Sequence, residues 1–184
     1  GEIGRYKSLA YLEDINNDSI LDKNGTNISL RLLVNNNDPT RVETAELVKS
    51  QLEAAGLSIT VESVDYETYK NRLATKDFDL FLGGWLLLPT PDFGFMFHSG
   101  MINSTNYISY QDGTMDQLLL KAYQSVSDDE IMTNYKNLYD YIQDQVPYFS
   151  LYFRNSAVVL GKNVTGEMTP STYNIFDGIE NISK

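Results

Sequence analysis

Between Ile28 and Leu82 the spacing of apolar residues switches back and forth between the period of a strand and that of a helix. The resulting order is strand, helix, strand, helix, strand, with the elements expected at 28–34, 45–55, 59–64, 66–74 and 78–82. Strands that are joined through helices lie parallel, because the crossover returns the chain to the same end of the sheet. The sequence therefore predicts an α/β fold, with a mixed, partly parallel sheet flanked by helices.

The rest of the chain predicts further helices and strands without a clear linker between them. Ser127 and Glu130 form a capping-box pattern before an amphipathic helix that ends at Pro147. Thr114 and Gln117 form the same pattern before the preceding helix. Apolar runs predict two more strands, at 148–152 and 157–160. An apolar stripe predicts an N-terminal helix at 2–12. We expect the 184 residues to form a single α/β lobe.

Charge, cysteine content and missing motifs exclude several classes of function. The formal net charge of −11 would repel a phosphate backbone, which argues against nucleic-acid binding. Without cysteine there is no disulfide, thiolate metal site or cysteine nucleophile. No apolar run reaches the ~18–20 residues that span a bilayer. The motifs of serine hydrolases, P-loop proteins and zinc proteases are also missing from the sequence. We therefore expect a protein that is not an enzyme and that needs no cofactor or metal.

The segment after the third expected strand is the best candidate for a ligand site. The apolar run at 78–82 ends at Gly83 and Gly84, and Trp85, the single tryptophan, follows directly. Ligands of open α/β sheets bind beyond the carboxyl ends of the strands. We therefore expect Trp85 and the residues just after it to form one wall of a binding site. A core position for Trp85 is the alternative, because large aromatic side chains are often buried for packing alone.

Short motifs in a fixed order run along nearly the whole chain. They are Asn17–Gly25, Leu52–Leu57, Tyr69–Leu73, Asp77–Asp79, Gly84 with Trp85, Pro91–Phe93, Asn106–Tyr110 and Pro147–Phe149. In this order the chain resembles the C-terminal lobe of the extracellular solute-binding proteins of the oligopeptide/dipeptide/nickel family, which serve ABC importers. The resemblance implies a two-lobed bacterial protein that closes on its ligand about a hinge, with this chain as one lobe.

The resemblance also implies partners and a location. The partners are a peptide or other small solute and the permease subunits of an ABC importer. The location is the extracellular face of the cell membrane or the periplasm. Attachment to the membrane would be only through a lipid-anchored cysteine, which would precede Gly1 together with a signal peptide and the N-terminal lobe.

One residue departs from the pattern of the family. Its peptide-binding members carry an aspartate three residues after the tryptophan, and that carboxylate pairs with the free ammonium of the peptide. The matching residue here is Leu88, which cannot form this charge-assisted bond. We therefore expect a peptide-like or largely apolar solute that is not anchored by a free α-amine. The expected ligand-binding residues are Trp85, Leu86, Leu88, Asn106 and Tyr107, although a solvated loop would also explain the last two.

Two other functions remain open at this point. An interaction or adhesion domain would keep this fold without transport, and a parent gene without an upstream second lobe would favour it. A small hydrolase would show turnover on glycosides or peptides, although nothing in the sequence pairs two carboxylates in a cleft.

A calcium loop is an alternative for the acidic stretch Asp14–Asp22. Asp14, Asn16 and Asp18 alternate as in an EF-hand loop. However, Ser19 and Gly25 stand where that pattern requires glycine and glutamate. An Asx-rich turn leading into the first strand is the other interpretation.

Overall fold

The computed structural model describes residues 12–87, 92–154 and 157–184. It forms two compact units, of which the first consists of Gly1–Trp85 with Asn103–Ser109 and the second of Leu86–Ile102 with Tyr110–Lys184. The expected helix at 2–12 lies, except for its last residue, outside the described residues. Among the described residues, no helix is both long enough and apolar enough to span a membrane.

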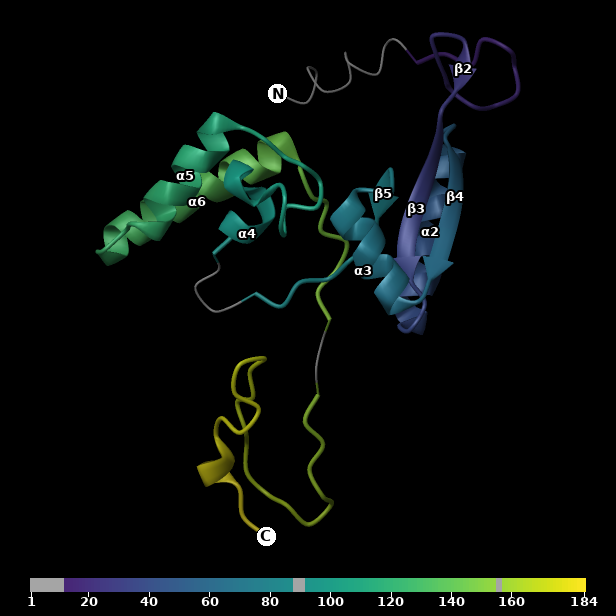
Figure 1. Cartoon of the computed structure of the whole chain (residues 1–184). Helices are drawn as coiled ribbons and strands as arrows, with labels where there is room; N and C mark the ends of the chain where they lie inside the picture. The colour runs from purple at the N-terminus through teal and green to yellow at the C-terminus, as the bar shows by residue number, and fades with distance from the viewer. Residues whose placement is uncertain (1–11, 88–91, 155–156) are drawn as a thin grey trace. The chain divides into compact units, whose positions relative to one another are not determined.

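A three-stranded parallel sheet forms the centre of the first unit. Strand β3 (Ser29–Asn35) lies between β4 (Ser58–Val64) and β5 (Leu80–Phe81), in the order β4-β3-β5 (Figure 1). Leu32 is the partner of Val61 on one side and of Leu80 on the other. A short antiparallel pair, β1 (Asp22–Lys23) with β2 (Thr26–Asn27), precedes the sheet. The predicted α/β fold with a partly parallel sheet is confirmed.

Two helices cover opposite faces of this sheet. Helix α2 (Pro39–Ala54) packs Ala45 against Leu32 and Val34 of β3. Helix α3 (Tyr66–Thr75) packs Tyr69 and Leu73 against Leu33, which points to the other face. The chain moves from β3 to one edge strand and then back to the other, so right-handed crossovers place the two helices on opposite sides. This explains why β3 is buried on both faces although its sequence alternates.

The ends of α2 and α3 follow local signals. Asp38 and Asp65 are the N-cap residues, and their carboxylates accept the N–H groups of Arg41 and Thr68. Gly56, a residue type that commonly ends helices, follows the C-cap residue Ala55 of α2 with a φ of +86°. Helix α3 ends differently, because Lys76 takes the left-handed conformation there, with φ 61° and ψ 27°.

In its described residues, the regular secondary structure of the second unit is helical, apart from an isolated bridge between Thr165 and Ser183. It contains α4 (Gly94–Phe97), a short 3₁₀ turn η1 (Ser99–Met101), α5 (Gly113–Tyr123), α6 (Asp128–Gln145) and a second 3₁₀ turn η2 (Ile179–Asn181). Its core consists of side chains from α4, α5 and α6, namely Met96, Phe97, Met115, Leu119, Ala122 and Leu138.

One of the two predicted capping boxes is present. At α6, the Ser127 hydroxyl and the Glu130 carboxylate each accept the other residue's N–H, as predicted. At α5 the prediction is wrong, because Asp112 is the N-cap residue and its carboxylate accepts the N–H of Met115 at 2.8 Å. Aspartate is the stronger cap and stands two residues before Thr114, so it sets the start of the helix.

The two strands expected at 148–152 and 157–160 are also wrong. These residues form neither strand nor helix, and large apolar side chains among them are exposed, such as Phe149 at 77%, Tyr152 at 50% and Val159 at 90%. The prediction rested on residue type alone. A strand also needs a neighbouring strand to accept its backbone hydrogen bonds. The described residues supply no such neighbour at this point.

Candidate functional site

Two loops of the first unit meet at the carboxyl ends of the parallel strands. Asn36 and Asn37 follow the last residue of β3, Asn35, and Leu82–Trp85 follows the adjacent strand β5. The two loops touch through Arg41, in the first turn of α2. The Nη2 atom of Arg41 lies 3.2 Å from the position that a Cβ atom at Gly84 would occupy. This edge is where ligands of open α/β sheets bind.

Trp85 and Tyr107 form an aromatic pair at this edge. Their ring centroids are 6.0 Å apart, and the ring planes differ by 12°. Trp85 remains 38% exposed, and Tyr107 also contacts Phe81 edge to face, at 6.4 Å and 89°. The structure therefore brings together two of the expected ligand-binding residues, and it leaves part of the indole open to solvent.

Asn106 supports this pair instead of lying on its surface. Its exposed fraction is 0%, and its backbone carbonyl accepts a hydrogen bond from Lys76 Nζ at 2.6 Å. The same ammonium lies 5.6 Å from the centre of the Tyr107 ring. Burial lowers the pKa of Lys76. Lys76 was not among the site residues predicted from the sequence. Its position directly after a predicted helix was the signal that could have drawn attention to it.

Of the two glycines before Trp85, Gly83 is the one that its packed neighbours require. A Cβ atom at Gly83 would lie 3.1 Å from the Tyr69 hydroxyl oxygen and 3.0 Å from the Phe81 ring. The Tyr69 hydroxyl donates to the carbonyl of Leu82 at 3.1 Å, and burial raises the pKa of Tyr69 to about 12. The hydroxyl therefore keeps its proton at neutral pH and holds the strand end in place. With both glycines exposed, this turn presents main chain to solvent.

Arg41 is held in place by polar groups at the end of β3. Its Nη1 atom donates to the side-chain carbonyl of Asn35, whose own amide donates to Asn37. Asn35 is 2% exposed, so the centre of this network is buried, whereas Asn37 is exposed and Arg41 is partly buried. The Asp38 carboxylate is 4.0 Å from Arg41 Nη2. These contacts fix the position of the Arg41 guanidinium beside the turn at Gly84. The sequence analysis did not predict a role for Arg41.

The other expected site residues lie in the second unit. Leu86 directly follows Trp85 in the chain and is 81% exposed. The carbonyl of Leu87 accepts a hydrogen bond from the Tyr173 hydroxyl at 2.8 Å. Leu88 lies outside the described residues.

The acidic stretch 14–22 folds as an Asx-rich turn. The Asp14 carboxylate accepts the N–H groups of Asp18 at 3.0 Å and Ser19 at 2.9 Å. In the same way, the Asp18 carboxylate accepts the N–H group of Ile20, and the Asp22 carboxylate accepts the N–H group of Ile15. Within the described ranges, no group of three or more acidic, histidine or cysteine side chains is arranged to hold a metal ion.

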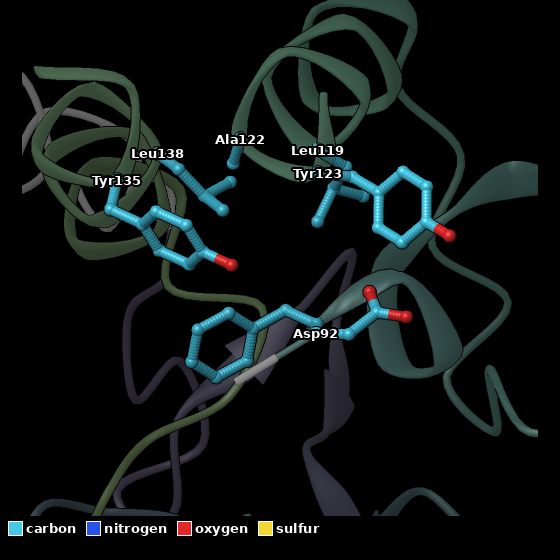
Figure 2. Close-up of a pocket in the computed structure, with 7 residues that line it drawn as sticks. Asp92, Leu119, Ala122, Tyr123, Tyr135 and Leu138 are labelled. Atoms are coloured by element: carbon cyan, nitrogen blue, oxygen red, sulfur yellow. The ribbon is translucent and has the colours of Figure 1, made fainter. Parts of the chain in front are cut away.

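A crevice in the second unit is lined by side chains from α5, α6 and the loop before α4 (Figure 2). The lining residues are Asp92, Phe93, Leu119, Ala122, Tyr123, Tyr135 and Leu138. Its volume of about 190 Å³ includes open solvent. Sites for small molecules usually enclose roughly 300–1,000 Å³. The crevice is therefore a packing gap between helices and not a second candidate for the ligand site.

Comparison with known proteins agrees with this architecture. Residues 10–106 match the family of bacterial extracellular solute-binding proteins, family 5 Middle. Over 158 residues the chain is 31% identical to the oligopeptide-binding protein AppA of Bacillus subtilis. This match covers 84% of this chain and 29% of AppA. Over 146 residues it is 26% identical to the probable D,D-dipeptide-binding periplasmic protein DdpA of Escherichia coli, covering 75% of this chain and 28% of DdpA.

A solved structure extends the match to almost the whole chain. The structure of Bacillus subtilis AppA in complex with a nonapeptide matches with a TM-score of 0.80 at 27% identity, over 98% of this chain and 36% of AppA's. The chain thus spans well under half the length of the relatives it matches. The chain is homologous to oligopeptide-binding components of ABC importers, and the proteins of this family bind solutes and are not enzymes. The match over 10–106 covers more than half of the 184 residues, and the chain belongs to family 5 of the bacterial extracellular solute-binding proteins.

Proposed function

We propose that this chain is one lobe of the substrate-binding component of an ABC importer, and that its ligand is a peptide-like or largely apolar solute. The observation that carries the proposal is the half-open Trp85–Tyr107 pair beside the bare main chain of Gly83 and Gly84. Aromatic faces bind apolar groups, and exposed extended main chain pairs with the main chain of a peptide. The nonapeptide bound to AppA is consistent with such a ligand.

The proposed contact surface is smaller than the sequence indicates. We assign ligand contact to Trp85 and Tyr107, and ligand contact by Leu86 and Leu88 remains an expectation from the family resemblance. Asn106 is assigned a supporting role because its side chain is buried. The ligand would be enclosed when a second lobe closes over this surface, in the extracellular space or the periplasm.

The proposal that the chain is one lobe has its own support. The matched part is 29% of AppA and 28% of DdpA, so most of each relative lies outside it. Apolar side chains of the C-terminal segment are exposed, among them Phe153, Val159 and Phe176. Contiguous exposed apolar surface marks interaction sites. We propose that the rest of the protein covers them, and that permease subunits bind the closed form.

Replacement of Trp85 in the full-length protein tests the site. Ligands that co-purify with the wild-type protein would be identified by mass spectrometry, and their affinity would then be measured by calorimetry. Trp85→Ala is expected to weaken binding about 10-fold or more, given the stacking and area that are lost. Trp85→Phe, which keeps an aromatic face, serves as the matched control. Equal affinities for the wild type and Trp85→Ala would refute the assignment.

The leucine at position 88 allows a test of ligand class. Leu88→Asp would place a carboxylate where it can pair with a free α-ammonium. We expect this variant to gain affinity for peptides with a free N-terminus relative to their N-acetylated forms. Leu86→Asp is the control for added negative charge at a neighbouring position. A gain that is the same for both peptide forms would count against peptide recognition at this place.

A further inference from the structure

Lys76 adopts a backbone conformation that is unfavourable for lysine. It follows α3 with φ 61° and ψ 27°, in the left-handed region. Helices commonly end with this conformation, but the residue is usually glycine because a Cβ atom is strained there. Helix termination alone therefore does not explain why a lysine stands at this position.

The Lys76 side chain makes two contacts that glycine would lose. Its ammonium donates to the carbonyl of Asn106 at 2.6 Å, and it lies 5.6 Å from the centre of the Tyr107 ring. The first is a charge-assisted hydrogen bond and the second is a cation–π contact. Both contacts reach residues that are thirty or more positions away in the chain.

These contacts tie a returning segment to the first unit. Asn103–Ser109 is separated in sequence from the rest of that unit by the first part of the second unit. Within this segment, Tyr107 meets Phe81 edge to face on one side and lies parallel to Trp85. The Lys76 ammonium thus meets both the backbone before Tyr107 and the ring itself.

We propose that Lys76 is a positioning residue for the ligand surface. Its ammonium fixes Asn106 and Tyr107, so that the Tyr107 ring stays parallel to Trp85. Tyr107 packs against Tyr69 and Leu73 of α3, the helix that Lys76 ends. The consequence for ligand affinity rests on the proposed function; the consequence for the Trp85–Tyr107 pair does not.

Substitution by glycine separates the two roles of this residue. Lys76→Gly removes the ammonium and also relieves the left-handed strain, so the helix still ends normally. Val146 offers a matched control, because it ends α6 in the second unit in the left-handed conformation, with φ 47° and ψ 52°. Val146→Gly relieves the same kind of strain without touching Lys76, Asn106 or Tyr107.

The first measurement is the fluorescence of Trp85 without ligand, taken as the difference from a matched Trp85→Phe protein. Lys76→Gly is expected to shift the emission to the red, because Tyr107 no longer holds the indole, whereas Val146→Gly leaves it unchanged. Lys76→Arg is expected to restore the wild-type emission, since arginine keeps the charge and the reach. Emission of Lys76→Gly identical to that of the wild type would overturn the proposal.

Affinity for the co-purified ligand is the second measurement. A loss of about 2- to 10-fold is expected for Lys76→Gly, which corresponds to the loss of one aromatic pair, with an unchanged midpoint of thermal unfolding. A loss of stability without a change in emission would indicate a purely structural lysine. A change in emission with unchanged affinity would leave Lys76 as a positioning residue and would instead count against Trp85 as a ligand contact.

Discussion

The indole of Trp85 and the phenol ring of Tyr107 lie parallel to within 12°, with their centroids 6.0 Å apart. The two residues come from separate stretches of the chain, so their pairing depends on the tertiary fold of the first unit. Ring pairs of this kind stabilise a fold by about 0.5–1.5 kcal/mol beyond the area that they bury. The pair is therefore both part of the proposed ligand surface and part of what holds that surface together.

Tyr107→Leu should lower the free energy of unfolding of the first unit by about 0.5–1.5 kcal/mol, because the ring contacts with Trp85 and Phe81 are lost. Urea unfolding followed by tryptophan fluorescence measures this change. Tyr107→Phe keeps the ring and should remain close to the wild type. Equal destabilisation by the two substitutions would show that the hydroxyl group matters and the ring stack does not.

Alanine at Gly83 should destabilise the protein more than alanine at Gly84. The added Cβ at position 83 meets the Phe81 ring at 3.0 Å and the Tyr69 hydroxyl at 3.1 Å, and both belong to packed residues. Overpacking of this kind costs about 1–3 kcal/mol. At position 84 the Cβ meets the end of the Arg41 side chain at 3.2 Å, which can move. Thermal unfolding of the two variants gives the comparison, and the opposite order would contradict the geometry.

Stability at alkaline pH should depend on Tyr69. Burial raises its pKa from 10.0 to about 12, so the folded state holds this proton more tightly than the unfolded state does. The corresponding stabilisation is fully present below pH 10 and is lost as the pH rises towards 12. Urea unfolding between pH 9 and 12 should therefore show a shallower decline for Tyr69→Phe than for the wild type.

At neutral pH, Tyr69→Phe should itself cost about 1 kcal/mol, because the partly buried hydrogen bond to the carbonyl of Leu82 is lost. Parallel curves for Tyr69→Phe and the wild type across the alkaline range would show that another group is responsible for the decline.

Asp112 should dominate the N-terminus of α5, in place of Thr114. Its carboxylate accepts the Met115 N–H at 2.8 Å and the Tyr141 hydroxyl at 3.1 Å, so Asp112→Ala should lower the melting temperature more than Thr114→Ala. The Met115 hydrogen bond is the largest of the interactions that lower the pKa of Asp112 below 3.8. The stabilisation that the Asp112 carboxylate gives to the folded state is therefore fully present above pH 3.8. It is lost as the pH falls through the pKa of Asp112 in the folded state. Asp112→Asn keeps a cap and should flatten this acid dependence.

The parallel sheet of the first unit and its two helices were predictable from sequence because each of these elements carries its own local signal, whereas the short pair of β1 and β2 was not predicted. Ile28–Leu82 contains the strand and helix periods in alternation, and Gly56 marks a helix end that the structure confirms. The capping box at Ser127 was likewise readable, because both of its partners lie within four residues. Such signals need no knowledge of distant contacts.

The capping box at Thr114 was wrong for a local reason, since Asp112 caps α5 instead, and the other errors arise where distant partners decide the outcome. The residues at 148–152 have the composition of a strand, but pairing depends on another segment of chain. Lys76, Arg41 and Tyr69 were missed for the same reason, because each acts on a residue that is far away in sequence. The pairing of Trp85 with Tyr107 could be expected only through the family resemblance. Ligand contact by these residues stays a prediction.

The left-handed lysine at position 76 also has an evolutionary consequence. Glycine there would suit the helix end better, but it would give up the contacts with Asn106 and Tyr107. A change at position 107 to a residue without an aromatic ring would remove one reason to retain the lysine. Among descendants of this sequence, we therefore expect the two positions to change in pairs, with glycine at 76 appearing mainly where position 107 has already lost its ring.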